Sequence, residues 1–555
     1  MSDSLFKKHQ HTLDGALTAI VERGFFSAYP EIPSGKIYGK NAKADGEAAF
    51  EALLNQPFIL NQPAITGSIG NEKSPFGMAL GISYPQVDLD ELLPAMQAQI
   101  PSWRNAGIEV RTGICLEILA KINQRSFEMG YSVMHTSGQG FAMAFQAGGP
   151  HAQDRGLEAV AYAYREMSQT APTTTWVKPQ GKREPLSIEK TYRIVPKGIG
   201  LVVACATFPT WNSYPGLFAS LMTGNPVVIK PHPGAILPLA ITVEVAQQVL
   251  AENGFAPYLV SLVCDGPETP IAKVLAVRDE VKLIDFTGSS AFGRWLEENA
   301  RQARVYTEKA GVNSIVIDSC EQLKPLIQNL TFSLCLYSGQ MCTTPQNIYI
   351  PEDGIMTSDG HLNFDEVAQV LAQGIDTFLS DPQRASEVLG AIVFDETIKR
   401  IQRAAVLGEV ILPSKVHRNE QFPEATLCSP LIVKINADDE QRYMQELFGP
   451  IVCLIPTKNT THSIALATLS AKAQGAITWG VYSTDDEVLV QMEEASLDAA
   501  VALSCNLTGG LFVNQAAAFS DFHASGANPA ANASLTDTAF VSGRFAIVQS
   551  RRHSV

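Results

Sequence analysis

The sequence predicts an α/β protein organised around a doubly wound parallel sheet. From Lys197 onward, short apolar runs alternate with stretches of helical periodicity, which is the pattern of strands joined by crossover helices. The first run, Gly200–Thr207, is continuously apolar, as expected of a parallel strand that helices cover on both faces. A chain of 555 residues exceeds what one hydrophobic core organises, so we expect two or three domains.

The composition narrows the class of partners. The chain carries 41 Lys and Arg against 56 Asp and Glu, a net charge of −15, and its pI is near 5.2. An acidic surface argues against nucleic acid or an anionic membrane as the main partner, although a local basic pocket could still bind a phosphate. No uncharged apolar run reaches the ~18 residues of a membrane span, and the polar N-terminus has no signal-peptide core. We therefore expect a cytoplasmic protein.

Cysteine and histidine usage does not indicate a metal centre or a disulfide framework. The nine cysteines lack CxxC spacing, and the ten histidines lack an HExxH motif. We expect no metal site.

The N-terminal third is predicted to be mainly helical. Apolar residues at helical spacing mark helices at Leu13–Phe26, Leu92–Ile100, Ile108–Ile122 and Asp154–Met167. The segment Thr173–Pro196 differs, because charged residues surround short β-like pieces. It is either a solvated hairpin or a hairpin that extends a sheet across a subunit interface, as an edge strand can.

Four strands and their helices follow. The predicted strands are Gly200–Thr207, Pro226–Lys230, Leu259–Cys264 and Val281–Phe286, and the predicted helices are Pro215–Met222, Leu237–Asn253, Glu268–Ala276 and Gly293–Asn299. In sheets of this kind, ligands bind beyond the carboxyl ends of the strands. The residues directly after each strand are therefore the first candidates for a functional site.

Three segments that follow strands carry candidate side chains. Trp211 and Asn212 lie on a loop bounded by prolines, where the amide could donate a hydrogen bond or simply form a turn. Lys230 ends the second strand and could reach a phosphate or a ribose hydroxyl, or extend to solvent. The turn Phe286-Thr-Gly-Ser-Ser290 opens a helix whose first N–H groups could face a pyrophosphate.

The second half predicts another α/β unit. Its predicted elements are strands at Ser314–Ile317 and Asn347–Ile350, helices at Pro325–Leu336, Phe364–Phe378 and Glu396–Val406, and a β-like tail at Ala539–Gln549. Regular alternation of this kind favours a second sheet with its own core.

Two residues of this region are candidates for acid–base or nucleophilic chemistry. Glu308 precedes a glycine between apolar stretches, and it is either an exposed carboxylate or a partly buried one whose pKa is raised into the range of a general base. Cys342 follows Gly339-Gln340 after a predicted helix, and it is either a small buried hydrophobe or a nucleophile. Further on, Glu446-Leu-Phe-Gly-Pro450 puts a carboxylate and a ring before a strand.

Taken together and in this order, these motifs resemble the aldehyde dehydrogenase superfamily. The resemblance runs from Trp211 to Asn514, and the thirty-four residues between Glu308 and Cys342 are the usual separation in that family. It implies a Rossmann-type cofactor domain at 1–310 with a return at 511–534, an α/β catalytic domain at 311–510, and a small β oligomerisation arm formed by 173–196 and 535–555. Such an arm implies a homodimer or a dimer of dimers.

The resemblance also implies roles for the site residues. Cys342 would attack an aldehyde, Asn212 would hold the oxyanion with the Cys342 N–H, and Glu308 would activate the water that hydrolyses a thioester. The residues implied to bind the cofactor are Lys230, His232, Phe286, Gly288, Ser289, Glu446, Phe448 and Trp211.

Two departures from the family pattern bear on the cofactor and the base. Members specific for NAD usually carry a Glu three residues after the lysine, and here that position is Pro233. Without that carboxylate a 2′-phosphate is not repelled and could pair with Lys230, so we expect NADP, with NAD as the alternative. The family's Leu-Gly-Gly after the base is replaced by Lys309-Ala310-Gly311, which makes the loop that carries Glu308 atypical.

The retained Glu308 favours oxidation to a carboxylate over transfer of the acyl group to coenzyme A. The whole-chain pattern resembles the PaaN-type semialdehyde dehydrogenases of phenylacetate degradation, which implies 3-oxo-5,6-dehydrosuberyl-CoA semialdehyde as substrate. The alternatives are 3,4-dehydroadipyl-CoA semialdehyde of benzoyl-CoA degradation and a general aldehyde. Use of the fold as a ligand-binding protein without catalysis is disfavoured, because Cys342 and Glu308 are both present.

Overall fold

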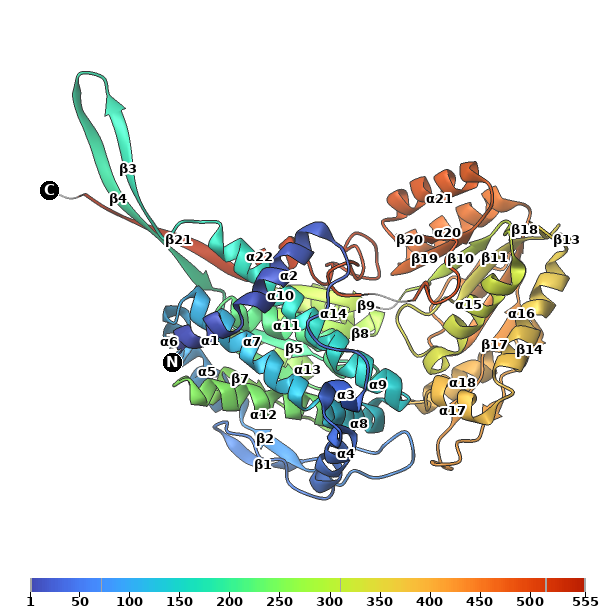
Figure 1. The fold of residues 1–555 in the computed structure, drawn as a ribbon, viewed down its shortest axis with the longest axis horizontal. Coiled ribbons are helices and arrows are strands. Elements are labelled where there is room, and N and C mark those ends of the chain that lie inside the picture. The colour runs from blue at the N-terminus through green and yellow to red at the C-terminus, as the bar shows by residue number, and fades with distance from the viewer. Residues whose placement is uncertain (1, 71, 310, 515–516, 554–555) are drawn as a thin grey trace.

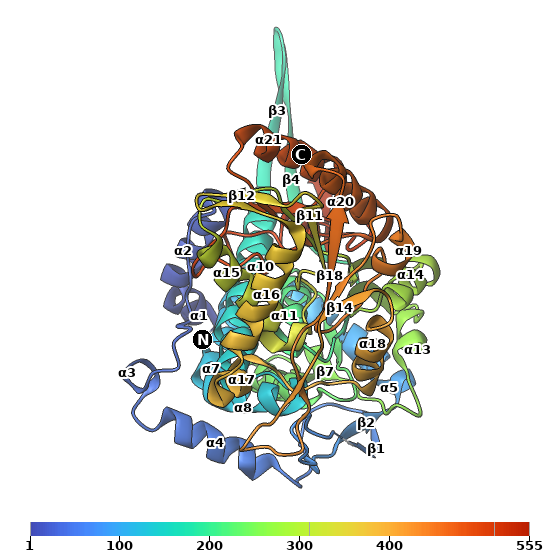
Figure 2. The same cartoon turned by 90° about the vertical axis from the view of Figure 1, so that its right-hand side faces the viewer.

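The computed structural model describes residues 2–70, 72–309, 311–514 and 517–553 of the chain. Two α/β bodies lie side by side, and a long β-hairpin projects from the first of them (Figure 1). A view at right angles shows the hairpin standing clear of both bodies (Figure 2). The predicted fold class, α/β with a doubly wound parallel sheet, is confirmed.

The first body is built on a five-stranded parallel sheet in the order β7-β6-β5-β8-β9. Its strands are β5 (Ile199–Val203), β6 (Val227–Lys230), β7 (Val260–Leu262), β8 (Val281–Gly288) and β9 (Arg304–Lys309). The strand order reverses at β5, so the carboxyl ends of β5 and β8 flank the switch point at which doubly wound sheets bind ligands. Apolar runs do not predict β9, because Arg304, Glu308 and Lys309 interrupt its pattern.

Helices cover both faces of this sheet. One face is covered by α11 (Pro209–Met222) and α12 (Leu237–Glu252), and these helices pack in turn against α7 (Ile108–Gln124) and α10 (Pro150–Ser168). The other face is covered by three helices, α5 (Leu89–Ala98), α13 (Ala272–Ala276) and α14 (Ser290–Asn299). The remaining N-terminal elements are α1 (Ser2–Lys8), α2 (Gln10–Glu22), α3 (Gly35–Tyr38), α4 (Ala42–Leu53), β1 (Ile65–Ile69), β2 (Tyr84–Val87), α6 (Ile100–Asn105), α8 (Ser126–Ser137) and α9 (Phe141–Gly148).

Helix α11 corrects one expectation that matters for the site. It begins at Pro209 instead of Pro215, so Trp211 and Asn212 lie in its first turn and not on a loop. Proline suits the first helical position, because its missing N–H would be unpaired there in any case. The helix therefore fixes the direction of the Asn212 side chain more firmly than a loop would.

The second body is built on a seven-stranded sheet in the order β14-β17-β18-β11-β10-β19-β20, in which only the β14–β17 pair is antiparallel. Its strands are β10 (Ser314–Ile317), β11 (Asn347–Pro351), β14 (Glu409–Leu412), β17 (Leu431–Lys434), β18 (Ile451–Thr457), β19 (Thr478–Tyr482) and β20 (Ala502–Cys505). Its helices are α15 (Leu323–Cys335), α16 (Phe364–Phe378), α17 (Pro382–Val388), α18 (Asp395–Ala404), α19 (Glu440–Tyr443), α20 (Thr460–Gln474) and α21 (Asp486–Ala499).

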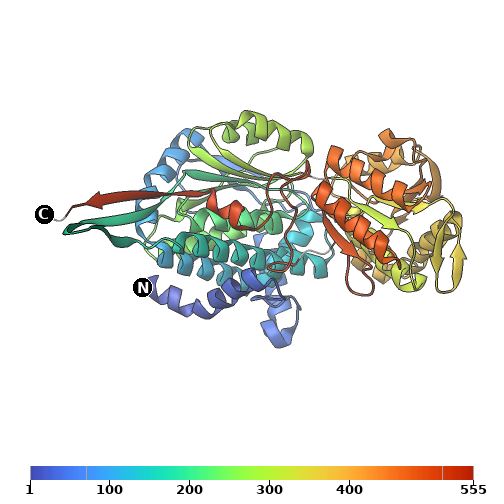
Figure 3. The ribbon, with the colours of Figure 1, turned by 90° about the horizontal axis from the view of Figure 1, so that it is seen from above.

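The projecting arm is a three-stranded antiparallel sheet in the order β21-β4-β3. The predicted hairpin is present as β3 (Thr173–Gln180) and β4 (Arg183–Pro196), and the C-terminal β21 (Phe545–Arg552) runs alongside it (Figure 3). The tail strand begins later than predicted, because the short helix α22 (Thr538–Ser542) precedes it. Apolar side chains on the arm are exposed, namely Trp176, Val177, Leu186, Ile547 and Val548.

A buried ion pair anchors the start of the tail strand to the first sheet. The Arg544 guanidinium donates to both carboxylate oxygens of Asp285 on β8, at 2.8 and 2.5 Å, and has no exposed side-chain surface. It also lies 4.4 Å from the centre of the Tyr306 ring. Removing one partner of such a pair typically costs about 3–5 kcal/mol, because the other charge is left buried and unpaired.

The chain returns to the first body after the second body is complete. Lys309 N donates to Ala530 O at 2.6 Å, and Asn532 N donates to Thr307 O at 3.1 Å, so the returning segment pairs with the outer edge of β9. This return brings residues more than two hundred positions away in sequence next to Glu308. Among the described helices, none combines the length and the apolar character that a crossing of a membrane requires.

Candidate active site

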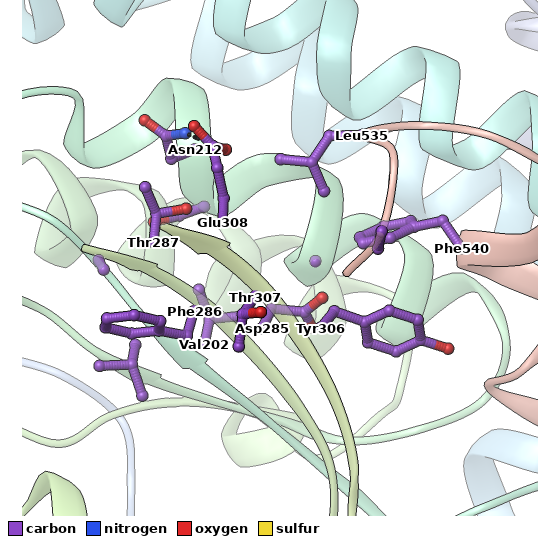
Figure 4. A pocket seen from close by; sticks show the side chains of 15 residues that line it. Val202, Asn212, Asp285, Phe286, Thr287, Tyr306, Thr307, Glu308, Leu535 and Phe540 are labelled. Atoms are coloured by element: carbon purple, nitrogen blue, oxygen red, sulfur yellow. Dashed lines mark hydrogen bonds between the residues drawn. The ribbon is translucent and has the colours of Figure 1, made fainter. Parts of the chain in front are cut away.

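Asn212, Glu308 and Cys342 come from three separate elements and meet in one buried cluster. Asn212 projects from the first turn of α11, Glu308 lies on β9, and Cys342 follows the 3₁₀ turn Leu336–Gly339. Asn212 Nδ2 donates to Glu308 Oε2 at 3.0 Å, and the two side chains face each other in Figure 4. The Cys342 sulfur lies within 4.8 Å of a Glu308 carboxylate oxygen.

A fourth member of this cluster, His523, was not predicted. Its Nε2 lies 2.9 Å from Glu308 Oε1 and 3.8 Å from Cys342 Sγ. The imidazole is buried, and its ring meets the Trp211 ring edge-on with centroids 4.7 Å apart. The sequence offers no signal for it, since it is a single histidine in a segment rich in Ala, Ser and Asn, and only the returning chain brings it to the site.

The electrostatics of the cluster favour a neutral thiol beside an ionised carboxylate. Burial raises the pKa of Cys342 well above its usual value, and the charge of Glu308 raises it further. Burial also acts to raise the pKa of Glu308, but the charge and hydrogen bond of His523, with the hydrogen bonds from Cys342 and Asn212, outweigh it and lower that pKa overall. The carboxylate is therefore ionised and the thiol is neutral in the resting arrangement.

The backbone before Cys342 is unusual and explains the Gly-Gln pair. Tyr337, Ser338 and Gly339 have φ of 54°, 48° and 62°, in the left-handed region. A Cβ at Gly339 would lie 2.5 Å from the carbonyl oxygen of Gly449, so only glycine allows this close approach. The loop is held from the other side, because Asn313 Nδ2 donates to Cys342 O at 2.7 Å.

That close approach brings the Glu446 motif to the nucleophile. One pocket is lined by Cys342, Asn313, Glu446 and Phe448, among others. Glu446 is half-buried, and desolvation raises its pKa to about 7, while Arg400 acts to lower it. Residues from two distant motifs thus share the space next to the thiol.

A second pocket lies at the carboxyl ends of β5, β8 and β9 (Figure 4). Phe286 and Thr287 line it together with Asn212 and Glu308. Beyond it, Ser289 is the N-cap of α14, and its hydroxyl accepts a hydrogen bond from Phe292 N at 3.3 Å. The predicted turn is therefore a helix N-terminus, which is a favourable place for an anionic group. A Cβ at Gly288 would lie 2.8 Å from the Phe286 ring, which accounts for the glycine.

Lys230 is buried at the end of β6 and has a partner that the sequence did not indicate. Its Nζ lies 2.7 Å from Oδ1 of Asp265, which follows β7 on the neighbouring strand. The contact is close but poorly aligned for a hydrogen bond, and Asp265 Oδ1 accepts none from the described residues. His232 accepts a hydrogen bond from Gly234 N, and burial with the nearby Lys230 charge lowers its pKa to about 4, so its ring is neutral.

The ligand atoms of Glu308, Cys342 and His523 all lie within 4.8 Å of one another, a spacing that a metal ion could also bridge. Because the three groups already satisfy one another by hydrogen bonding, we interpret them as an acid–base cluster. Ala310, in the atypical loop after the base, lies outside the described residues. Lys309 is held by Glu297 on α14, with Nζ–Oε1 at 2.8 Å, which fixes the chain directly after Glu308.

Comparisons with known proteins place the chain beside one family. The model of the aldehyde dehydrogenase family matches residues 83–533. The crystal structure of an NAD-dependent aldehyde dehydrogenase from Burkholderia multivorans is 54% identical, with a TM-score of 0.98 over 99% of both chains. A 1-pyrroline-5-carboxylate dehydrogenase from Thermus with bound NAD shares the fold, with a TM-score of 0.75 at 18% identity over 96% of this chain and 99% of that one.

Curated relatives are more distant in sequence. A 1-pyrroline-5-carboxylate dehydrogenase of Bacillus subtilis is 23% identical over 67% of this chain and 70% of its own length. A putative aldehyde dehydrogenase of Gibberella moniliformis is 27% identical over 56% of this chain and 63% of its own length. These alignments leave about a third of each relative unmatched.

Proposed function

The chain belongs to the aldehyde dehydrogenase family, and on that basis we propose that it oxidises an aldehyde to a carboxylic acid through a covalent intermediate on Cys342. The observation that carries the proposal is the buried cluster in which Glu308 contacts both the Cys342 thiol and the Asn212 amide. A nucleophile, a base and an amide donor within hydrogen-bond reach are what acyl chemistry at a thiol requires.

The first step is attack of the thiol on the aldehyde carbon. Glu308 accepts the thiol proton as the sulfur–carbon bond forms, and the carbonyl oxygen becomes the oxyanion of a thiohemiacetal. Asn212 Nδ2 and the N–H of Cys342 stabilise that oxyanion. Because Asn212 donates to Glu308 in the resting arrangement, the base must release the amide before the substrate oxygen can occupy the oxyanion site.

The residues around the two pockets fit a nicotinamide dinucleotide. Glu446 and Phe448 beside Cys342 would hold the nicotinamide ribose, the α14 N-terminus at Ser289 would face the pyrophosphate, and Lys230 would reach the adenosine ribose. When bound, this cofactor accepts a hydride and so converts the thiohemiacetal to a thioester.

Hydrolysis of the thioester restores the enzyme. Glu308 first loses to solvent the proton that it took from the thiol. It then takes a proton from water as the hydroxide attacks the thioester carbonyl, the carbon–sulfur bond breaks to release the acid, and the thiolate recovers a proton from Glu308. The same carboxylate therefore serves both halves of the reaction.

A Glu308→Gln variant separates the two halves. Gln can accept a proton neither from the thiol nor from water, so we expect a slowed first phase that still yields one reduced cofactor per Cys342, followed by turnover that is lower by roughly 10²–10⁴-fold. Stopped-flow absorbance of the reduced nicotinamide measures both phases. Steady turnover equal to that of the parent enzyme would contradict the role of Glu308.

The choice between NAD and NADP depends on two opposed features. The missing carboxylate at Pro233 favours NADP, which is the preference expected from the sequence. Asp265, however, places a buried carboxylate 2.7 Å from the Nζ of the lysine that would bind a 2′-phosphate. The related Burkholderia protein is described as NAD-dependent. We therefore propose NAD as the preferred cofactor, with NADP accepted less well.

An Asp265→Asn variant tests this assignment. Removing the carboxylate leaves Lys230 free to pair with a 2′-phosphate, so kcat/KM for NADP relative to NAD should rise about tenfold or more. The ratio is obtained by titrating each cofactor at a fixed aldehyde concentration. An unchanged ratio, or a parent enzyme that prefers NADP, would show that Asp265 does not select the cofactor.

For the substrate, we propose a CoA-linked semialdehyde from aromatic ring cleavage, supported by the motif resemblance to the phenylacetate-degradation branch. The test is cofactor reduction with a panel that holds 3-oxo-5,6-dehydrosuberyl-CoA semialdehyde, 3,4-dehydroadipyl-CoA semialdehyde, and simple aliphatic and aromatic aldehydes. We expect the highest kcat/KM with the first. A higher value for a simple aldehyde would make the enzyme a general aldehyde dehydrogenase.

We also propose a division of the chain into domains. Residues 1–310, together with the returning segment 511–534, form the cofactor domain, and residues 311–510 form the catalytic domain. The arm joins copies of the chain. The exposed apolar side chains of the arm, such as Trp176 and Val548, support the last point, since an isolated hairpin gains nothing from exposing them. Light scattering should give at least twice the chain mass of 59.9 kDa. A monomer would contradict the proposed oligomer.

A further inference from the structure

The Glu308 carboxylate needs hydrogen-bond donors to stay charged in a buried position, and the proposed reaction removes one of them. The carboxylate is almost fully buried, and burial without partners would protonate it at neutral pH. Asn212 supplies one hydrogen bond to Oε2, but the proposed mechanism requires that bond to break when the substrate oxygen arrives. A second donor must then keep the carboxylate charged.

We propose that His523 is a positioning residue that keeps the resting Glu308 ionised and holds it in reach of Cys342 throughout the reaction. This inference rests on the proposed function and extends it. The His523 Nε2 is 2.9 Å from Glu308 Oε1, the oxygen that Asn212 does not contact, so its hydrogen bond survives when the amide turns to the substrate.

The hydrogen-bond pattern indicates which ring nitrogen carries the proton. Nδ1 of His523 is buried and has no partner among the described residues. A proton on Nδ1 alone would leave a buried donor unpaired and would turn the Nε2 lone pair toward a carboxylate. A proton on Nε2 is donated directly to Glu308. The nitrogen nearest the thiol is therefore a donor to the base and does not act as the acceptor of the thiol proton.

The charged and titratable groups around this pair are few. Cys342 and Cys205 are the thiols near Glu308, and both have their pKa raised by burial. The Arg155 guanidinium lies 5.1 Å from the Trp211 ring, on which the imidazole also packs, and it pairs with Glu158. Lys309 follows Glu308 but pairs with Glu297. His523 is thus the one described cationic or neutral nitrogen base that contacts the Glu308 carboxylate.

The consequence is a pH dependence with a defined direction. Glu308 works as a base only when ionised, so activity falls as the pH drops through its pKa. Removing the His523 donor removes a hydrogen bond that lowers this pKa, and the acidic limb should move to higher pH.

The experiment compares His523→Leu, His523→Gln and the parent enzyme, with His361→Gln as a control at an exposed histidine on β13 (Gly360–Leu362). Two profiles are recorded against pH for each protein. One is kcat/KM for the best aldehyde of the panel, and the other is the rate at which iodoacetamide alkylates Cys342, followed by peptide mass spectrometry. Thermal unfolding of each variant verifies that the fold is retained.

We expect the Leu variant to move the acidic limb of both profiles upward by roughly one to three pH units. The Gln variant keeps an N–H that can reach Glu308, so the acidic limb of its profiles should lie close to the acidic limb of the parent enzyme. The His361 control should also leave the acidic limb unchanged. A limb that does not move in the Leu variant would overturn the proposal, because the ring would then only pack against Trp211. A Gln variant as impaired as the Leu variant at every pH would overturn it as well, since the imidazole itself would then carry the proton.

The two profiles also separate this inference from the proposed function. If no aldehyde supports cofactor reduction, the proposed oxidation fails. Alkylation of Cys342 requires no aldehyde, and its pH profile still decides whether His523 controls the base.

Discussion

The arrangement of this molecule depends on keeping one carboxylate charged inside protein. Glu308 is buried on β9 and accepts hydrogen bonds on both oxygens, from Asn212 on one and from His523 on the other, while it also contacts the Cys342 thiol. An ion in such a place is tolerated only when its lone pairs are satisfied. Each of the three partners comes from a different part of the chain, so the charge is stable only when the whole fold is assembled.

Three features of the fold place these partners next to Glu308. The doubly wound sheet ends β9 beside the first turn of α11, which brings Glu308 to Asn212. The second body presents Cys342 on a loop that Gly339 allows to press against Gly449. The returning segment then pairs with the edge of β9 and places His523 over the carboxylate. The buried Arg544–Asp285 pair holds the end of that return, so a contact far from the chemistry supports its geometry.

Much of this was predictable from the sequence, and the exceptions have a common cause. Apolar runs predict four strands of the first sheet within a few residues, and the order of the motifs predicts Asn212, Glu308 and Cys342 as site residues. The β9 strand was not predicted, because it carries charges that only the returning chain and α14 cover. His523 and Asp265 were not predicted either. Each is an ordinary polar residue in its local sequence, and its importance arises from a partner that the fold brings near, Glu308 in one case and Lys230 in the other.

The central claim is that Cys342 carries the acyl group. The most direct measurement is mass spectrometry of the Glu308→Gln protein after it is mixed with aldehyde and NAD and quenched in acid. We expect the mass of the substrate acyl group on the peptide that contains Cys342, formed only when the cofactor is present and lost on treatment with hydroxylamine. Reduced cofactor without any adduct at Cys342, or an adduct on another residue, would contradict it.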